Sequence, residues 1–168
     1  MAPCKAGVIW SDDFDDGDYN GWIGGNSAFS AEDGILKTVP GDSLYALYYP
    51  SYVTTGTWSF DVLVGAETDI RLLYNPEGEE QSLTLYLYGT HIILYSFESI
   101  YGQKSVKLGE FMLARSMTGW QHINVTRDLD GRNCVYINGT LILDVMDHAA
   151  IASEFFYYLS YALFMMSC

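Results

Sequence analysis

Residues 119–145 decide the fold class: they read Gly-Trp-Gln-His-Ile-Asn-Val-Thr-Arg-Asp-Leu-Asp-Gly-Arg-Asn-Cys-Val-Tyr-Ile-Asn-Gly-Thr-Leu-Ile-Leu-Asp-Val. In the first part, Ile123 and Val125 alternate with polar neighbours, which is the period-two pattern of a strand with one buried face. The dipeptides Asp130-Gly131 and Asn138-Gly139 are typical of tight hairpin turns. The stretch therefore predicts three antiparallel strands joined by two tight turns.

The same signals continue on both sides of this meander. Residues 54–64 alternate most clearly, with Trp58, Phe60 and Val62 on one face. Other predicted strands and hairpins are 28–37 (a hairpin about Asp33-Gly34), 44–49, 70–74, 82–88 with 91–97 (a hairpin about Gly89-Thr90), 106–113, and 155–166, which is long enough for two strands with a bend near Ser160. About a dozen short strands without a sustained helical period indicate a two-sheet sandwich or a barrel.

The composition predicts one β-rich domain over residues 1–168. The chain has 168 residues, which suits one core, and its 49% hydrophobic and 15% aromatic residues exclude a disordered chain. Its 14 tyrosines and 16 glycines favour strands and turns. The longest apolar run, 155–166, is shorter than the roughly 18 residues that span a bilayer, so no membrane insertion is expected.

The charge of the chain restricts its partners. The formal net charge is −13, and only 8 residues are Lys or Arg. A protein that binds nucleic acid needs a basic surface for the phosphates, so nucleic acid is excluded as the expected partner. A low isoelectric point is compatible with cations or with neutral ligands such as glycans.

The three cysteines have no spacing typical of a metal site. Cys4, Cys134 and Cys168 lie far apart in the sequence, so a zinc site is not predicted. Cys4 and Cys168 are near the two ends of the chain, which often lie close together in a single domain. Two alternatives stay open: a disulfide between Cys4 and Cys168, or three free thiols.

An acidic segment near the start combines core anchors with oxygen ligands. Residues 10–22 read Trp-Ser-Asp-Asp-Phe-Asp-Asp-Gly-Asp-Tyr-Asn-Gly-Trp, which predicts a first strand leaving the core through a loop. Calcium prefers hard oxygen ligands on a flexible loop, and the candidates are Asp13, Asp15, Asp16, Asp18 and Asn20. The spacing is not that of an EF-hand, and a solvated acidic turn is the alternative.

Taken in order, several motifs resemble the concanavalin A-like lectin/glucanase superfamily, including its laminin-G-like and laminarinase-like modules. The motifs are 12–22, 29–36, 120–126 (Trp-Gln-His-Ile-Asn-Val-Thr), Asp130-Gly131, 135–139 (Val-Tyr-Ile-Asn-Gly) and Asp144. The series covers most of the chain. The resemblance implies an all-β, antiparallel two-sheet jelly-roll sandwich with one concave sheet.

The resemblance also implies a set of calcium ligands. In similar modules a structural calcium is held by an acid near the N-terminal strand, by a backbone carbonyl in the next hairpin, here Gly34, and by an acid on the last strand. This chain departs at the last point, because 155–168 contains no Asp or Glu and only Glu154 borders it. The expected calcium ligands are therefore Asp13, Asp15, Asp16, Asp18 and Gly34, with a solvated turn as the alternative.

The carboxylates and the histidines do not have the spacing of a known catalytic site. Retaining glucanases of this superfamily carry acids at alternating strand positions, as in E-x-D-x-E, with the two catalytic carboxyl groups about 5 to 5.5 Å apart. This pattern is absent here, and the nearest acidic cluster lies in a Pro/Gly loop, at Glu77, Glu79 and Glu80. The sequence assigns no Ser or carboxylate partner to the histidines, His91, His122 and His148, and His122 is predicted to be structural.

Sugar binding would use aromatic faces that stack on pyranose rings. The candidates on a concave sheet are Tyr86, Tyr88, Tyr95 and Tyr101, although strand tyrosines also pack at the edge of a core. The expected function is a non-catalytic carbohydrate-binding or cell-surface recognition module, extracellular or on the cell surface, stabilised by a structural calcium. The alternatives are a structural or protein-interaction domain and a diverged glycoside hydrolase.

Overall fold

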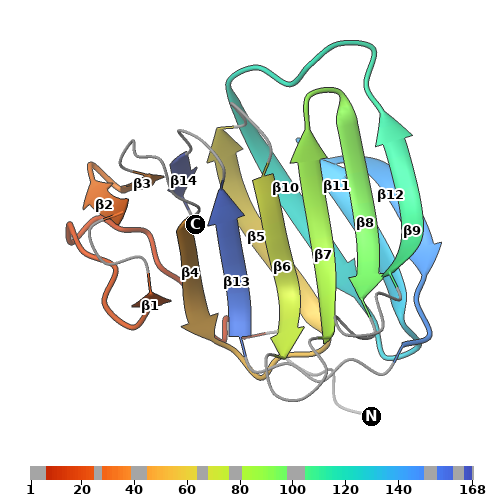
Figure 1. Ribbon diagram of the computed structural model, residues 1–168, viewed down its shortest axis with the longest axis horizontal. Helices are drawn as coiled ribbons and strands as arrows, with labels where there is room; N and C mark the ends of the chain where they lie inside the picture. The colour runs from red at the N-terminus through yellow and green to blue at the C-terminus, as the bar shows by residue number, and fades with distance from the viewer. Residues whose placement is uncertain are drawn as a thin grey trace.

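The computed structural model describes residues 7–24, 28–38, 45–63, 68–75, 81–97, 105–149, 155–160 and 165–167. These residues form 14 β-strands in two seven-stranded sheets, one in front of the other (Figure 1). Every strand pairing within them is antiparallel. The described part of the chain contains no helix long and apolar enough to cross a membrane. The predicted all-β, two-sheet sandwich is confirmed.

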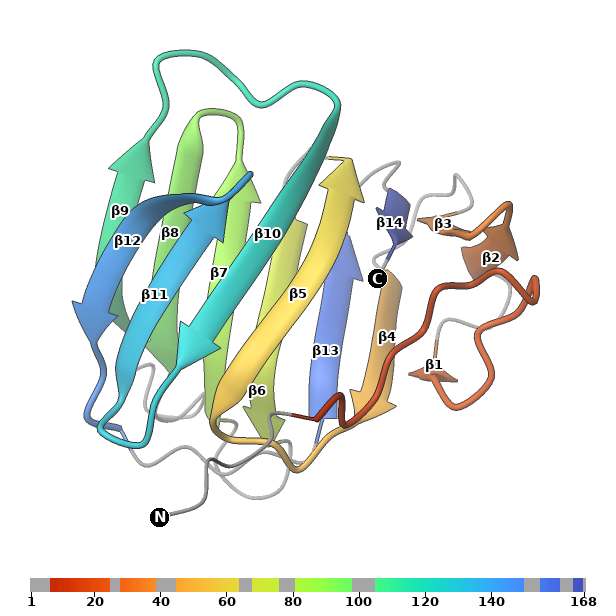
Figure 2. The same ribbon diagram turned by 180° about the vertical axis from the view of Figure 1, so that it is seen from behind.

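Sheet A, in spatial order, consists of β1 (Ile23–Gly24), β4 (Tyr45–Pro50), β13 (Phe155–Ser160), β6 (Thr68–Asn75), β7 (Gln81–Tyr88), β8 (His91–Phe97) and β9 (Ser105–Met112). Sheet B, in spatial order, consists of β12 (Thr140–Met146), β11 (Arg132–Ile137), β10 (Trp120–Arg127), β5 (Gly56–Leu63), β14 (Met165–Ser167), β3 (Ile35–Thr38) and β2 (Phe29–Glu32). Sheet A faces the viewer in Figure 1, and sheet B faces the viewer in Figure 2.

The core lies between the two sheets, and the period-two pattern explains it. Trp58, Phe60 and Val62 of β5 are buried, as their alternation predicted. Ile92 and Leu94 of β8, in sheet A, are fully buried in the same core cluster. The side chains between these positions point away from the core, so each sheet has an outer face with its own chemistry.

The predicted hairpins are confirmed. Strands β2 and β3 pair about Asp33-Gly34, β7 and β8 pair directly, and β10, β11 and β12 form the predicted meander. Asp33 and Asn138 have positive φ angles of 54° and 49°, which Asp and Asn tolerate better than most residues. The turn dipeptides were therefore reliable local signals.

The final apolar segment forms two strands, as predicted, but the strands belong to different sheets. Strand β13 lies between β4 and β6 in sheet A, and β14 lies between β5 and β3 in sheet B. Phe156 of β13 is 1% exposed and contacts the ring of Trp22. This late segment therefore completes both layers of the sandwich.

The acidic N-terminal segment is not a strand, and that prediction was wrong. Residues 7–22 are irregular, and the first strand begins at Ile23. Asp12 explains the turn, because its carboxylate accepts hydrogen bonds from the Phe14 backbone N–H (3.0 Å) and from Trp22 Nε1 (2.7 Å). The predicted anchoring is confirmed, since Phe14 is fully buried and Trp22 is 8% exposed.

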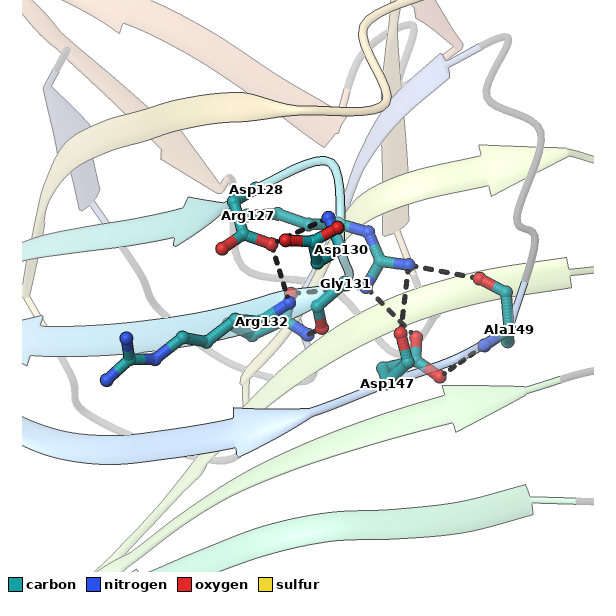
Figure 3. A network of polar contacts seen from close by, with 8 residues as sticks. Arg127, Asp128, Asp130, Gly131, Arg132, Asp147 and Ala149 are labelled. Carbon is teal, nitrogen blue, oxygen red and sulfur yellow. Dashed lines mark hydrogen bonds and ion pairs between the residues drawn. The ribbon is translucent and has the colours of Figure 1, made fainter.

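A buried polar network joins the β10–β11 turn to the segment after β12 (Figure 3). Arg127 Nη1 donates to Asp147 Oδ2 (3.1 Å) and to Asn133 Oδ1 (3.3 Å). Arg127 Nη2 donates to the Ala149 carbonyl (3.0 Å), and the Asp147 N–H donates to the Gly131 carbonyl (2.9 Å). Because both charges are paired and hydrogen-bonded, the network is a structural clamp at one end of sheet B.

Candidate functional site

Among the residues that the structure describes, the outer face of sheet A carries most of the aromatic side chains that do not belong to the main core. We call it the tyrosine face. Its aromatic members come from β4, β6, β7, β8 and β13 and are Tyr48, Tyr74, Tyr86, Tyr88, Tyr95, Phe97 and Phe155. Tyr74 is the centre of a second small apolar cluster with Ala46, Tyr48 and Phe155 on this face. The sheet therefore has ordered aromatic packing on both sides.

Three of the four predicted sugar-binding tyrosines lie on this face. Tyr86 and Tyr95 are half-buried, and their ring centroids are 5.3 Å apart in an edge-to-face contact. Tyr88 lies at the end of β7 and is 57% exposed. Tyr101 lies outside the described residues. Tyr95 also contacts Phe97, at 5.7 Å between centroids, so the rings form a continuous row.

Polar groups lie beside the aromatic row, and sequence reasoning missed them. In the β6–β7 register, Asp69 is opposite Tyr86 and Arg71 is opposite Thr84. The Arg71 guanidinium carbon is 4.9 Å from the centroid of the Tyr74 ring, a cation–π contact. The alternation of Asp69 and Arg71 in a short strand was the signal that could have revealed them.

Some of these polar side chains are buried even though they point away from the core. Asp69 is 4% exposed, Ser82 is 4% exposed and Thr84 is 1% exposed. The Ser82 and Thr84 hydroxyl oxygens are 3.0 Å apart and share a hydrogen bond. Neighbouring side chains therefore cover the floor of the tyrosine face, where the Ser82 and Thr84 hydroxyls hold each other.

Residues 67–71 have the order of the glucanase pattern with one replacement. They read Glu67-Thr-Asp-Ile-Arg71, or E-x-D-x-R, so Arg71 stands where E-x-D-x-E has its last acid. The side chain of Glu67 lies outside the described residues, as do Glu77, Glu79 and Glu80. A guanidinium group always carries its proton and cannot act as a general acid near neutral pH.

A charged cluster borders the tyrosine face at strands β8 and β9. Glu110 Oε2 accepts a hydrogen bond from Lys107 Nζ (2.7 Å), and Glu110 Oε1 is 2.7 Å from His91 Nδ1. The hydrogen bond from Lys107 is the main cause that lowers the pKa of Glu110, and His91 adds to it. The same contact raises the pKa of Lys107. The cluster keeps Glu110 ionised beside the aromatic row.

The predicted calcium ligands are only partly brought together. A Cβ built at Gly34 would lie 2.5 Å from Asp15 Oδ1 and 3.4 Å from the Asp13 carbonyl oxygen, so these two oxygens approach the hairpin. Asp16 and Asp18 accept backbone hydrogen bonds from Asp18 and Asn20 within the loop. Among the residues that the structure describes, no three His, Cys, Asp or Glu side chains form a group that could hold a metal ion.

His122 has partners that its sequence neighbours did not reveal. Its Nδ1 is 2.8 Å from Asp61 Oδ1, and its Nε2 is 3.5 Å from Ser59 Oγ. These residues lie on the outer face of sheet B, and 61 to 63 positions separate them in the chain. Period-two patterns place each residue on a face, but they do not give the register between distant strands.

Several solved structures share this architecture. The carbohydrate-binding module CBM66 from Bacillus subtilis aligns with a TM-score of 0.70 at 12% identity, over 88% of this chain and 92% of that one. A native glycosidic hydrolase gives a TM-score of 0.72 at 9% identity, over 96% of this chain and 95% of that one. The β-glucanase of Bacillus licheniformis gives a TM-score of 0.64 at 12% identity, over 97% and 96%.

No protein-family model and no curated protein matches the sequence. The structural matches define the class: the chain has the concanavalin A-like jelly-roll fold, as the motif series implied. At these identities the matches establish the fold alone, and the same fold hosts both binding modules and enzymes.

Proposed function

We propose that this protein is a carbohydrate-binding domain whose tyrosine face binds a glycan without cleaving it. The observation that carries the proposal is the aromatic row with polar groups beside it. Tyr86 and Tyr95 offer rings for stacking, and Arg71 and Asp69 lie on the adjacent strand. Carbohydrate sites combine aromatic faces with a few positioned polar groups.

The replacement at position 71 supports a binding role over catalysis. Retaining hydrolysis needs two carboxyl groups about 5 to 5.5 Å apart, one of which donates a proton. Arg71 supplies a permanent cation and hydrogen-bond donors at that strand position. The net charge of −13 favours neutral glycans, because it would repel polyanionic ones.

The proposal is tested by affinity electrophoresis and calorimetry against neutral polysaccharides. We expect the wild type to be retarded by at least one of them, and Tyr95→Ala to lose about fivefold or more in affinity, since each aromatic stacking contact contributes on the order of 1 kcal/mol. Tyr136→Ala is the matched control, because Tyr136 is a half-buried strand tyrosine on the outer face of sheet B. Equal affinity of the two variants would overturn the assignment of the face.

A structural or protein-interaction domain is the competing function, and the packing of the tyrosines on one another is the observation that favours it. Tyr86 and Tyr95 are half-buried, so part of each ring is already in contact with protein. Absence of binding to every neutral polysaccharide and to a glycan array would favour this alternative. An extracellular or cell-surface setting stays a prediction.

We further propose that a structural calcium binds at the first hairpin. The Asp15 carboxylate and the Asp13 carbonyl oxygen approach Gly34 and would be protein ligands, together with the Gly34 carbonyl that the resemblance implies. Calcium takes 6 to 8 oxygens, so water would complete the set. Excess calcium should raise the melting temperature relative to EDTA, and Asp15→Asn should reduce that difference. The same melting temperature in calcium and in EDTA would contradict the proposed calcium site.

A further inference from the structure

Ser59, His122 and Asp61 lie together on the outer face of sheet B, on the opposite side of the molecule from the tyrosine face. Strands β5 and β10 are adjacent, and their register places His122 directly opposite Asp61. Ser59 is two residues from Asp61 on the same face of β5. The site is open to solvent, because the side chains of His122 and Asp61 are 46% and 41% exposed.

The pairing with Asp61 selects one tautomer of His122. An ionised Asp61 carboxylate only accepts, so His122 Nδ1 carries a proton and donates it across the 2.8 Å contact. Neutral His122 then has a free acceptor at Nε2, and the Ser59 hydroxyl, 3.5 Å away, is the donor that faces it. This order of nucleophile, base and orienting carboxylate is that of an acyl-transfer triad, and such contacts shorten when substrate binds.

Acyl transfer also needs a hydrogen-bond donor for the oxyanion, and the residue opposite Ser59 offers one. Asn124 is the cross-strand partner of Ser59, and cross-strand partners have Cβ atoms roughly 4.5 to 5.5 Å apart. Its side-chain amide can donate a hydrogen bond to an oxyanion formed at Ser59. Tyr136 is the partner of Asn124 on β11 and is half-buried on the same face, where it offers an apolar surface to an acyl group.

We propose that Ser59, His122 and Asp61 form an acyl-transfer site that hydrolyses small carboxylic esters. The Ser59 Oγ attacks the ester carbonyl carbon while its proton passes to His122 Nε2. The carbon–oxygen bond to the alcohol then breaks, and the alcohol leaves with that proton. Water then attacks the acyl-serine carbonyl carbon while its proton passes to His122 Nε2. The bond from that carbon to Ser59 Oγ breaks, His122 returns the proton to Oγ, and the carboxylic acid leaves. This site is independent of glycan binding by the tyrosine face.

The experiment uses 4-nitrophenyl acetate as the ester and a fluorophosphonate as a covalent probe. We expect the wild type to gain the mass of one phosphonyl group, located at Ser59, as fluoride leaves. Hydrolysis of the ester by Ser59→Ala should fall at least about tenfold, because nucleophile and base act as a unit. Asp61→Asn should lower the rate in the same direction, because Asn does not hold the imidazole in the required tautomer.

Exposed imidazoles also hydrolyse this ester without a serine, so a histidine control is needed. His148→Ala removes an exposed histidine from the segment after β12 and should leave the rate and the labelling unchanged. Melting curves check the fold of each variant, and labelling of the wild type needs no variant at all. The proposal would be overturned if the probe left Ser59 of the wild type unlabelled. It would also be overturned if folded Ser59→Ala hydrolysed the ester at the rate of the wild type.

Discussion

Gly131 occupies a position that no other residue fits, because the backbone of the clamp passes directly over it. Its φ is +87°, and a Cβ there would overlap the Asp147 carbonyl oxygen. Gly131→Ala should destabilise the protein by more than the roughly 1–3 kcal/mol of a strained φ alone. Gly139→Ala is the control, since Gly139 has a similar φ of +77° but open space around its Cα. Urea unfolding of both variants should show a clearly larger loss for Gly131→Ala, and equal losses would contradict the overlap.

Glu110 makes the stability dependent on pH in a defined direction. Its folded-state pKa is lowered below the ordinary value of 4.5 by Lys107 and His91, so its contribution is present above about pH 4.5 and is lost as the pH falls through the lowered pKa. Glu110→Gln should therefore melt below the wild type at pH 6, and the difference should shrink as the pH falls below 4.5. A difference that persists at the lower pH would show that the carboxylate charge is not its cause.

At the scale of elements, two Arg–Asp pairs differ in burial and should differ in their contribution to stability: Arg127 of β10 with Asp147 after β12, and Arg132 of β11 with Asp144 of β12. Arg127 and Asp147 have side chains that are 7% and 5% exposed, whereas Arg132 and Asp144 are 55% and 39% exposed. Arg127→Met leaves the Asp147 charge buried and should cost about 3–5 kcal/mol. Arg132→Met should cost much less than Arg127→Met, because exposed pairs contribute little.

The double variant Arg127→Met/Asp147→Leu separates pairing from burial. Removing both charges takes away the uncompensated carboxylate, so the double variant should recover part of the stability lost by Arg127→Met. Guanidinium denaturation of the wild type, Arg127→Met, Asp147→Leu and the double variant provides the measurement. If the double variant is as unstable as the sum of its parts, the backbone hydrogen bonds of the clamp matter more than its charges.

For the whole molecule, the two sheets should unfold together. Strands β13 and β14 belong to one short segment and complete sheet A and sheet B respectively, and Phe156 lies in the core that both sheets share. Far-UV circular dichroism and tryptophan fluorescence should therefore give coincident denaturation curves. Two separated transitions would show that the sheets are independent units.

The sequence predicted the local features, such as turns and hairpins, but not the register between strands that are far apart in the chain. Turn dipeptides such as Asn138-Gly139 act over a few residues, so the hairpins and the meander were recovered. The pairing of Asp61 with His122 depends on register between strands 61 positions apart, which no local pattern encodes. The irregular path of 7–22 was also missed, because Asp12 bonds to the ring nitrogen of Trp22 only after the tryptophan is packed.

The sequence named candidate tyrosines and expected them on one face, and their role in sugar binding stays a prediction. Alternation in 82–88 and 91–97 was enough to place Tyr86, Tyr88 and Tyr95 on one surface. Asp69 and Arg71 were missed because their strand was predicted from its apolar residues, while a bulge between Arg71 and Leu73 interrupts the alternation. Irregularities of this kind follow from packing between sheets, so they become visible only in three dimensions.

The place of β13 between β4 and β6 has a consequence for how the protein is made. Synthesis begins at the N-terminus, so β4 and β6 leave the ribosome long before the strand that hydrogen-bonds to both of them. Until residues 155–160 emerge, each of the two earlier strands has an open edge with unpaired backbone groups, which is a template for association with other chains. The nascent protein should therefore depend on a chaperone until β13 has been translated.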